Sequence, residues 1–201
     1  MSFALQFTRV VNRESEEPDK GTRCFVVDDS TLEKSGKTIE GVSRVNDHAK
    51  RGYTFVFKFL LLVFFDGTML IPADFSLHRE SQKTNFGLTK EEQRKQHESR
   101  NPRDSHGETR KRELDEKKTD MAIAMIKRAV KRGLQASYVL MDSWFTSEEV
   151  IGKGRGIKKG MLHVVGMCKM DRRKFTFKGK EYNSATIVKM HENGSKVRSS
   201  T

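Results

Sequence analysis

Residues 53–71 of this chain read YTFVFKFLLLVFFDGTMLI. The run 53–65 is almost wholly aromatic and aliphatic, with Lys58 inside it, and that composition favours a strand over a helix. Asp66-Gly67 separates this run from a second apolar run, 68–71. An Asp-Gly pair in that place predicts a tight hairpin, because glycine takes a positive φ without strain. The stretch therefore predicts two antiparallel strands.

A third strand is predicted on the amino-terminal side of this hairpin. Cys24–Val27 is a short apolar run with β-branched residues, and it ends at Asp28-Asp29. The intervening residues 30–52 are polar and rich in turn formers. We therefore expect three strands up to about residue 78, with the last two joined tightly.

The remainder of the chain alternates helices with strands. The clearest helix begins at Thr119 and ends near Gly133, because apolar side chains recur at helical spacing between them. Ser137–Met141 is the next predicted strand, Ser147 begins a second helix, and 161–167 is a further strand. Three antiparallel strands followed by helix, strand, helix and strand indicate an α/β protein with a mixed sheet.

Composition excludes several classes of protein. The 201 residues suit one domain, or one domain with an appendage. The longest apolar run is shorter than the ~20 residues of a membrane-spanning helix, so no membrane association is expected, and no secretory signal is evident. Two cysteines, Cys24 and Cys168, cannot build a disulfide framework and indicate a reducing cytosol. Both are interpreted as buried small apolar residues.

The formal net charge of +12 is unevenly distributed along the chain. Residues 1–150 carry 26 basic and 24 acidic side chains, whereas residues 151–201 carry 13 basic and 3 acidic ones. An excess of this kind favours a polyanionic partner, most simply nucleic acid. Residues 79–118, by contrast, hold 12 basic and 9 acidic side chains. That balance indicates a solvated helical or disordered excursion rather than a DNA-contacting arm.

Several familiar motifs fail on inspection. Gly152, Gly154 and Gly156 miss the dinucleotide-binding spacing, and the basic residues between them favour a flexible loop. Two distant cysteines and six scattered histidines give no ligand pair at zinc-finger spacing. The pair Asp47-His48 is interpreted as part of the turn before the second strand rather than as a metal site.

Two aspartates stand at the ends of predicted strands, Asp28 after Val27 and Asp142 after Met141. In a mixed sheet, strand ends open into the crevice where ligands bind. Two carboxylates brought together there could hold Mg²⁺ or Mn²⁺, which prefer hard oxygen ligands, beside a phosphodiester. The alternative is that each aspartate caps a turn or a helix.

Several short motifs in order carry a resemblance to a known family. They are Val26-Val27-Asp28-Asp29-Ser30, Gly41-Val42-Ser43-Arg44, Asp66-Gly67, Ile71-Pro72-Ala73-Asp74-Phe75 and Val139-Leu140-Met141-Asp142-Ser143-Trp144-Phe145. Together they resemble a DDE transposase of bacterial insertion sequences, in the insertion-sequence family numbered four. The resemblance covers roughly residues 21–182 and implies a ribonuclease-H-like catalytic domain.

The catalytic set of that family is Asp, Asp and Glu. By resemblance, Asp28 and Asp142 are the catalytic and metal-binding aspartates, and the Asp-x-Ser setting selects Asp28 over Asp29. Asp28 would bridge two Mg²⁺ (or Mn²⁺) ions, and Asp142 would complete one of the two sites.

The resemblance implies a reaction and a setting. Double-stranded DNA would be nicked at the transposon end, and the freed 3′-hydroxyl would then attack target DNA. The protein would be bacterial, cytoplasmic and associated with the nucleoid. Its oligomeric state stays open, although transposases of this type generally work as dimers on paired ends.

The glutamate of the family has no evident counterpart here. It belongs to a Tyr-x2-Arg-x3-Glu-x6-Lys signature beyond a β-rich insertion, and the residues after Asp142 do not contain that signature. Glu148 and Glu149 lie too close to Asp142, while Glu181 and Glu192 lack the Tyr and Arg partners. We therefore expect a truncated chain with impaired strand transfer. Its expected parts are a polar segment 1–20, a catalytic core 21–170 containing the charged excursion 79–118, and the start of the insertion at 171–201 with a strand at 174–182.

Further side chains after Asp142 are predicted to contact DNA. Lys153, Arg155, Lys158 and Lys159 would bind phosphates, with a generic solvated loop as the alternative. Trp144 either packs beneath the sheet or touches DNA beside the metal ions.

Two other functions stay open. A non-catalytic basic DNA-binding fragment would bind DNA without needing Asp28 or Asp142. A complete small nuclease would draw its third carboxylate from a nearby residue such as Glu148 or Asp47.

Overall fold

The structure is a computed structural model that describes residue 6 and residues 22–47, 50–80, 87–98 and 105–198. Its strands are β1 (Cys24–Lys34), β2 (Ser43–Asp47), β3 (Gly52–Phe65), β4 (Leu70–His78), β5 (Tyr138–Met141), β6 (His163–Gly166), β7 (Lys174–Phe177) and β8 (Lys180–Asn183). Its helices are α2 (Lys90–Arg94), α3 (His106–Glu113), α4 (Lys118–Lys131), α5 (Glu148–Gly156) and α6 (Ser184–Arg198). None of the described helices is long and apolar enough to cross a membrane.

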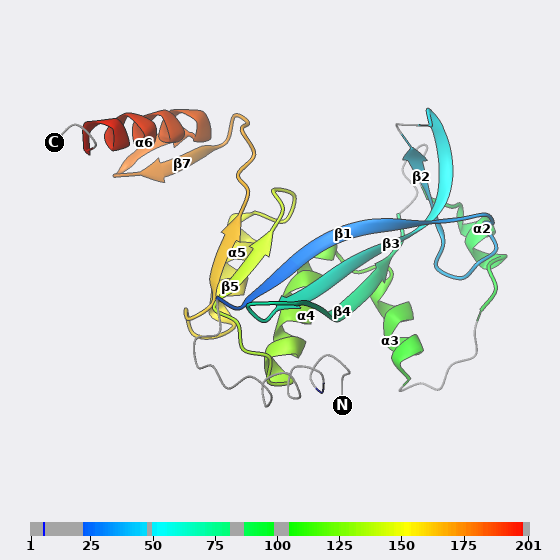
Figure 1. Ribbon diagram of the computed structural model, residues 1–201. Helices are drawn as coiled ribbons and strands as arrows, with labels where there is room; N and C mark the ends of the chain where they lie inside the picture. Colours follow the sequence, from blue (N-terminus) through cyan, green and yellow to red (C-terminus); the bar gives the residue numbers. More distant parts are fainter. Residues whose placement is uncertain (1–5, 7–21, 48–49, 81–86, 99–104, 199–201) are drawn as a thin grey trace.

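Six strands form one mixed sheet (Figure 1). Its order is β2-β3-β1-β5-β6, and β4 also pairs with β3. The pairs β1–β3, β2–β3 and β3–β4 are antiparallel, whereas β1–β5 and β5–β6 are parallel. The predicted α/β class with a mixed sheet is confirmed, and the arrangement is compatible with a ribonuclease-H-like domain.

The predicted hairpin joins β3 to β4. Asp66 holds the turn, since its Oδ1 accepts hydrogen bonds from the backbone N–H groups of Thr68 at 2.9 Å and Met69 at 2.8 Å. Gly67 takes a φ of 110°, which a side chain would strain. The Asp-Gly pair therefore does what its residue types predict.

Helix α4 supplies much of the hydrophobic core. Its apolar side chains recur on one face and are buried against the sheet together with side chains of β1, β3, β5 and α5. The largest fully buried members of this core are Phe25, Phe64, Phe145, Leu60, Leu62, Met125, Ile126 and Leu162. Each contributes about 1.5–3 kcal/mol of burial free energy, so this face is the main source of stability.

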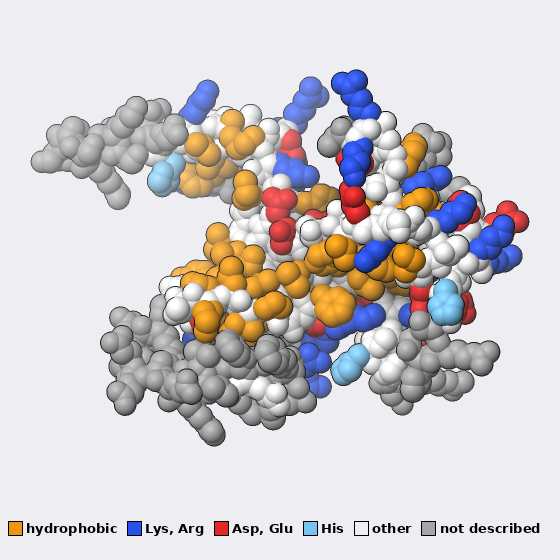
Figure 2. Space-filling model, turned by 45° about the vertical axis from the view of Figure 1, so that its right-hand side comes forward, with side chains coloured by type: hydrophobic (Ala, Val, Ile, Leu, Met, Phe, Trp, Pro, Cys, Tyr) orange, Lys and Arg blue, Asp and Glu red, His pale blue; other side chains and the backbone are white. Residues whose placement is uncertain are grey.

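The opposite face of the sheet stays open in the described part of the chain. Side chains alternate along a strand, so Asp28 shares this face with its cross-strand partner Leu61, and Leu61 shares it with Phe75. Exposed apolar side chains lie on it, among them Leu32, Leu70, Phe75, Leu140 and Val165. Figure 2 shows hydrophobic side chains gathered in a band that crosses the molecule. We will call the face that carries Asp28 the open face.

Two strand predictions need correction. The strand beginning at Cys24 was expected to end at Asp28, but β1 continues to Lys34 because residues 28–34 pair with Leu61–Phe55 of β3. Residues 30–52 were expected to be turns, yet they contain β2, which pairs with Gly52–Val56. In both cases the long apolar strand β3 offers backbone partners that a polar sequence can use.

The described part of the charged excursion contains helices α2 and α3, and it is not solvated throughout. Helix α2 begins with a capping box, in which Thr89 accepts from the backbone N–H of Glu92 and the Glu92 side chain accepts from that of Thr89. Leu88 and Leu114 are buried, and so is the side chain of Glu113. The described part of this region therefore packs against the domain.

Two predictions about the carboxyl-terminal part also need correction. The glycine-rich run 152–156 was expected to be a flexible loop, but it lies in α5, which Ser147 caps as predicted. The expected strand 174–182 is a hairpin, β7–β8, and α6 follows it. Figure 1 shows β7 and α6 set apart from the main sheet.

Candidate functional site

Asp28, within β1, and Asp142, directly after β5, lie side by side on the sheet. Strand β1 is parallel to β5, and Val27 is the register partner of Met141. The residue that follows each of these two partners is one of the two aspartates. Both line a hollow of about 410 Å³ on the open face. The other residues around it are Val26, Val27, Leu140, Met141, Val165, Gly166 and Met167. The structure thus brings together the two carboxylates that the sequence singled out.

Local backbone contacts hold both carboxylates. Asp142 Oδ1 accepts a hydrogen bond from the backbone N–H of Ser143 at 2.6 Å, and Asp28 Oδ1 accepts one from Asp29 at 2.9 Å. The carbonyl oxygen of Asp142 accepts from the Phe145 N–H at 3.0 Å and from Thr146 Oγ1 at 3.0 Å. Phe145 is fully buried, so the turn that carries Asp142 is anchored in the core.

The neighbouring Asp29 points to the other face. Alternation along β1 places it on the side of the helices, where its carboxylate forms an ion pair with Lys118 of α4. Asp28 is therefore the aspartate of this pair that lines the hollow. The choice of Asp28 over Asp29 from the Asp-x-Ser setting stays a prediction.

The two carboxylates around this hollow suit a hard divalent cation. Exposed carboxylate oxygens are the ligands that Mg²⁺ and Mn²⁺ prefer. Within the described ranges, no group of three or more His, Cys, Asp or Glu side chains is placed to hold a metal ion. Glu148 lines a different hollow, and Asp47 Oδ1 accepts a hydrogen bond from the Lys50 N–H at 3.2 Å. The described residues therefore offer two carboxylates here.

Trp144, two residues after Asp142, lies at the surface. Its side chain is 53% exposed, so the interpretation that it packs beneath the sheet is wrong. Phe145 is the residue that enters the core, and the two rings meet edge to face at 4.9 Å between centroids. The Lys118 ammonium lies 5.7 Å from the centroid of the Trp144 ring.

The four predicted phosphate-binding cations do not cluster next to Asp142. Helix α5 connects two parallel strands, so it runs away from the carboxylates toward the opposite edge of the sheet. Lys158 donates to Gln135 Oε1 at 2.8 Å, near the start of β5, and Lys159 follows it with a φ of 52°. Both lie beyond the end of α5.

The other two cations lie on α5 itself. Lys153 forms ion pairs with Glu149 at 2.6 Å and Asp120 at 2.9 Å, and these hydrogen bonds raise the pKa of its ammonium above the ordinary value. Arg155 lines a hollow of about 800 Å³ together with Thr146 and other residues that follow Asp142. Of the four, Arg155 is the one that shares a hollow with the segment next to Asp142.

The two cysteines differ in environment. Cys24 is buried in β1 as predicted, and burial raises the pKa of its thiol. Cys168 is exposed after β6, so its interpretation as a buried residue is wrong.

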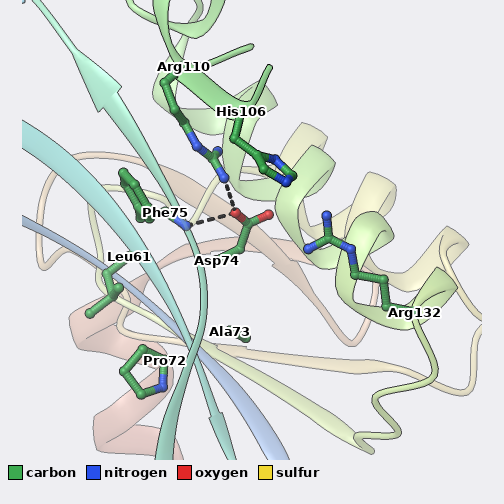
Figure 3. Close-up of a pocket in the computed structure, with 8 residues that line it drawn as sticks. All are labelled: Leu61, Pro72, Ala73, Asp74, Phe75, His106, Arg110 and Arg132. Atoms are coloured by element: carbon green, nitrogen blue, oxygen red, sulfur yellow. Dashed lines mark hydrogen bonds and ion pairs between the residues drawn. The ribbon is translucent and has the colours of Figure 1, made fainter. Parts of the chain in front are cut away.

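The edge of β4 carries another hollow, which the sequence did not suggest (Figure 3). Its volume is about 360 Å³. Leu61, Pro72, Ala73, Asp74 and Phe75 come from β3 and β4, while His106, Arg110 and Arg132 come from α3 and the end of α4.

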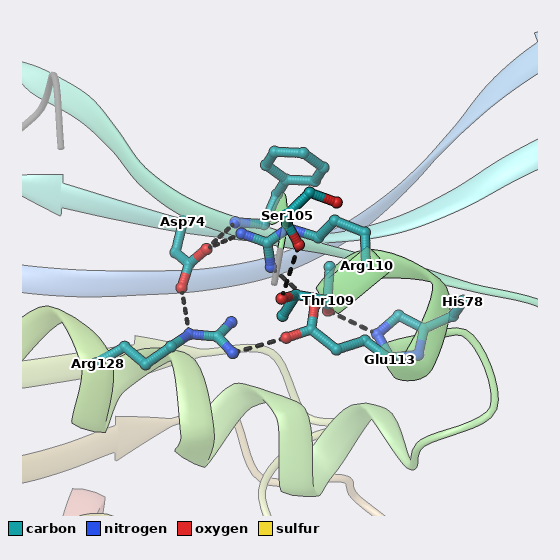
Figure 4. Close-up of polar contacts among 9 residues, drawn as sticks. Asp74, His78, Ser105, Thr109, Arg110, Glu113 and Arg128 are labelled. Atoms are coloured by element: carbon teal, nitrogen blue, oxygen red, sulfur yellow. Dashed lines mark hydrogen bonds and ion pairs between the residues drawn. The ribbon is translucent and has the colours of Figure 1, made fainter. Parts of the chain in front are cut away.

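Behind this hollow lies a buried ionic cluster that sequence reasoning also missed (Figure 4). Asp74 of β4 bonds to Arg110 of α3 at 2.7 Å and to Arg128 of α4 at 2.7 Å. Glu113 completes the cluster, at 2.7 Å from Arg110 and 2.6 Å from Arg128. The side chains of Asp74 and Glu113 are 4% and 8% exposed. We will call these four residues the ionic cluster.

The ionic cluster shifts the pKa of Arg128. Burial lowers the pKa of Arg128, but the two carboxylates outweigh this effect and hold its pKa above the ordinary value. Its members come from three elements, with Asp74 lying 36 residues from Arg110 and 54 from Arg128. The spacing of these residues along the chain could not have revealed the cluster. The motif Ile71-Pro72-Ala73-Asp74-Phe75, which contains Asp74, is the feature of the sequence that points to it.

Comparison with known protein families shows what the chain is similar to. A family model described as DDE superfamily endonuclease matches residues 3–178. No curated protein matches the chain.

Proposed function

The chain belongs to the DDE superfamily endonucleases, and on that premise we propose that it is the catalytic core of a DNA transposase. DNA is the substrate of this family, and its members generally use divalent metal ions. The observation that supports the proposal best is the placement of Asp28, within β1, beside Asp142, directly after the adjacent parallel strand β5, around one hollow.

We assign the two aspartates as ligands of Mg²⁺ or Mn²⁺. When bound, such an ion supplies positive charge that stabilises the attacking and leaving oxygens of a phosphodiester. Asp28 and Asp142 would hold it at the rim of the open face, where a DNA strand has access. The exposed ring of Trp144 would contact the strand beside them. Arg155 is the best placed of the four predicted cations to bind a phosphate.

The proposed reaction has two steps. Water attacks a phosphorus at the transposon end, the P–O3′ bond breaks, and the leaving oxygen takes up a proton to give a free 3′-hydroxyl. That hydroxyl then loses its proton and attacks a phosphorus of target DNA, so that a new P–O bond forms as the target P–O3′ bond breaks. We further propose that the protein belongs to the insertion-sequence group and works as a dimer on paired ends.

We propose that this chain performs the second step poorly by itself. Two carboxylates bind Mg²⁺ weakly, and the described residues place no third one beside them. A glutamate in the Tyr-x2-Arg-x3-Glu-x6-Lys setting would have to come from elsewhere.

Metal binding tests the assignment independently of turnover. Titration calorimetry with Mn²⁺ should show binding that Asp28→Asn and Asp142→Asn each weaken by at least about tenfold, because each removes one charged ligand. Asp29→Asn is the matched control, since Asp29 is the adjacent carboxylate on the other face. Equal binding by Asp28→Asn and the unaltered chain would contradict the assignment.

Nicking of supercoiled plasmid with Mg²⁺ or Mn²⁺ tests the activity. We expect nicking that is lost in Asp28→Asn and Asp142→Asn and kept in Asp29→Asn. Robust strand transfer by this chain, abolished by Asp28→Ala, would overturn the proposal that it lacks a needed carboxylate.

A non-catalytic DNA-binding role is the second candidate. It is favoured by the concentration of positive charge in residues 151–201, which carry 13 basic and 3 acidic side chains. It predicts DNA binding with a steep salt dependence that Asp28→Ala and Asp142→Ala leave unchanged, and no nicking at any metal concentration.

A further inference from the structure

The hollow at the edge of β4 combines an aromatic wall with cations (Figure 3). Phe75, Leu61 and Pro72 form its apolar side, whereas the side chains of Arg110, His106 and Arg132 reach it from the helices. The register of β4 against β3 shifts at Leu62 and Val63, and such a bulge bends the strand that forms the wall. A volume of about 360 Å³ is enough for a small ligand or one unit of a polymer.

The charges around the hollow leave a cationic surplus. Arg110 is neutralised within the ionic cluster, whose two arginines balance Asp74 and Glu113. Arg132 is exposed, and no ion pair joins it to another residue of the described ranges. Figure 3 shows its guanidinium directed toward the hollow, opposite Arg110. Asp74 also lines the hollow, but its carboxylate is already paired with Arg110 and Arg128. An anionic group entering the hollow would therefore meet the Arg132 guanidinium, which no carboxylate of the described ranges neutralises.

The aromatic wall is held in place. The Arg110 guanidinium lies 4.5 Å from the centroid of the Phe75 ring, and the ionic cluster fixes that guanidinium in turn. Phe75 is nevertheless 45% exposed, so the ring still offers surface to a ligand. A phenylalanine ring has no hydrogen-bonding group, so it would recognise an apolar face such as that of a nucleobase.

The hollow lies in line with the carboxylate pair. Asp28 is the cross-strand partner of Leu61, and Leu61 is the partner of Phe75, so the three side chains form one row across the open face. Two strand spacings of about 4.8 Å put the hollow roughly 10 Å from Asp28. Successive phosphates of one strand in a duplex advance about 3.4 Å along the helix axis, and an unpaired strand is more extended, so this distance spans at most about three nucleotides.

We propose that this hollow is a subsite for one unpaired nucleotide of the DNA strand that reaches Asp28. Phe75 stacks on the base, and Arg132, with His106 beside it, binds the phosphate. The base must be unpaired because the face of a paired base is covered by its neighbours in the duplex. The link between this subsite and strand cleavage rests on the proposed function, whereas the binding itself does not.

Binding measured in EDTA tests the subsite without any turnover. The probes are a fluorescent DNA duplex with blunt ends and the same duplex with a single-stranded overhang of about five nucleotides. We expect Arg132→Gln to weaken binding of both by about fivefold and to reduce the slope of log K against log salt by about one. Lys131→Gln is the matched control, because it removes the same charge from the adjacent exposed residue, which does not line the hollow.

The aromatic wall is tested by preference between the two probes. Phe75→Leu should abolish the preference for the overhang, with a loss of about tenfold on that probe and little change on the blunt duplex. Tyr53→Leu is the control, since Tyr53 is an exposed ring on β3 that also packs against an arginine, Arg44 at 5.3 Å. Circular dichroism spectra must match for all four variants.

The outcomes separate this inference from the proposed function. If Arg132→Gln behaves like Lys131→Gln, or Phe75→Leu like Tyr53→Leu, the subsite is wrong, even where nicking depends on Asp28. If the subsite variants weaken binding as expected while no nicking occurs, the subsite stands and the proposed function fails.

Discussion

At the scale of single residues, Asp74 shows how one carboxylate can join three elements. It lies on β4, and its two oxygens receive hydrogen bonds from Arg110 of α3 and Arg128 of α4. Oδ1 also accepts from the backbone N–H of Phe75 at 2.9 Å. Buried charges of this kind are stabilised by their partners, so the loss of one member leaves the others in a poor environment.

Asp74→Asn should destabilise the fold strongly. The amide keeps the shape but removes the negative charge, which leaves two partly buried guanidinium groups sharing the buried Glu113. We expect the free energy of unfolding to fall by about 3–5 kcal/mol in urea denaturation. Asp115→Asn is the control: Asp115 pairs with Arg79 at 2.5 Å but is 67% exposed, so it should cost less than about 1 kcal/mol. Equal losses for the two variants would show that the ionic cluster is not a buried unit.

His78 should make stability depend on pH. Its Nδ1 donates to the carbonyl oxygen of Glu116 at 3.2 Å, so Nε2 accepts from the Ser76 hydroxyl at 2.8 Å. Burial lowers the pKa of His78 below the ordinary 6.5, and the bond to Glu116 opposes this only in part. Below pH 6.5 the unfolded chain binds a proton at His78 more readily than the folded chain does. The free energy of unfolding therefore falls as the pH drops below 6.5, and it stays constant above that pH.

The His78 prediction is checked by urea denaturation at about pH 7.5 and pH 5.5. His78→Gln should be less stable than the unaltered chain at the higher pH, because it loses a side chain that packs well in the fold. Its free energy of unfolding should, however, fall less between the two pH values. His191→Gln, at an exposed histidine of α6, should follow the unaltered chain at both. If His78→Gln leaves the pH response unchanged, the response comes from other titratable groups.

At the scale of elements, α5 shows why a glycine-rich run can still form a helix. Gly154 faces the sheet, where a Cβ atom would lie 2.9 Å from Val164 Cγ2. A Cβ at Gly152 would meet no atom within 4 Å. The two glycines, two residues apart on one helix, therefore have different roles.

Alanine at these two positions should act in opposite directions. Gly152→Ala should stabilise the protein by about 0.5–1 kcal/mol, since alanine loses less entropy in a helix. Gly154→Ala should destabilise it by about 1–3 kcal/mol, because the β-branched Val164 cannot easily move aside. Thermal or urea unfolding measures both, and a stabilising Gly154→Ala would be inconsistent with the contact between α5 and β6.

The elements that could be predicted from the sequence are those specified by their own residues. The hairpin at Asp66-Gly67, helix α4 and the start of α5 at Ser147 each carry a local signal. Strand β2 and the continuation of β1 to Lys34 do not, since polar residues form strands there because β3 provides a partner. The helical state of residues 152–156 likewise depends on packing against β6.

The candidate site could be predicted in part for the same reason. Asp28 and Asp142 each follow a short apolar run, and the parallel pairing of β1 with β5 brings the ends of these two runs together. The hollow beside Phe75 could not be predicted, because its walls come from β3, β4, α3 and α4, and no spacing along the chain connects Phe75 with Arg132. Lys158 and Lys159 lie away from Asp142, because nearness in sequence says nothing about the direction in which α5 runs, and their contact with DNA stays a prediction.

At the scale of the whole molecule, the chain divides after β6. Strands β7 and β8 pair with each other and pack on α6, and Figure 1 shows β7 and α6 apart from the main sheet. Residues 165–176 between them form a continuous exposed run. This division agrees with the predicted boundary between residues 170 and 171, which stays a prediction.

Limited proteolysis should reveal the division. Trypsin should cut early after Lys169, Arg172 or Arg173, all of which are exposed, and leave a product of the main sheet that resists longer. Intact-mass spectrometry identifies the new termini. Cleavage after Arg128, which the ionic cluster holds in α4, should come much later. Simultaneous cleavage at both places would mean that the two parts unfold as one.

The parallel pairing of β1 with β5 also determines when the carboxylate pair can arise during synthesis. Strands β1, β3 and β4 all lie within residues 24–78, whereas β5 begins at Tyr138. A ribosome adds about 5–20 residues per second, so β5 emerges about 3–12 s after β4. Throughout that interval Asp28 lacks Asp142, and a nascent chain that stalls before β5 does not hold this carboxylate pair with which to damage DNA. The long connection between the two strands thus delays the appearance of the candidate metal site until most of the chain has been made.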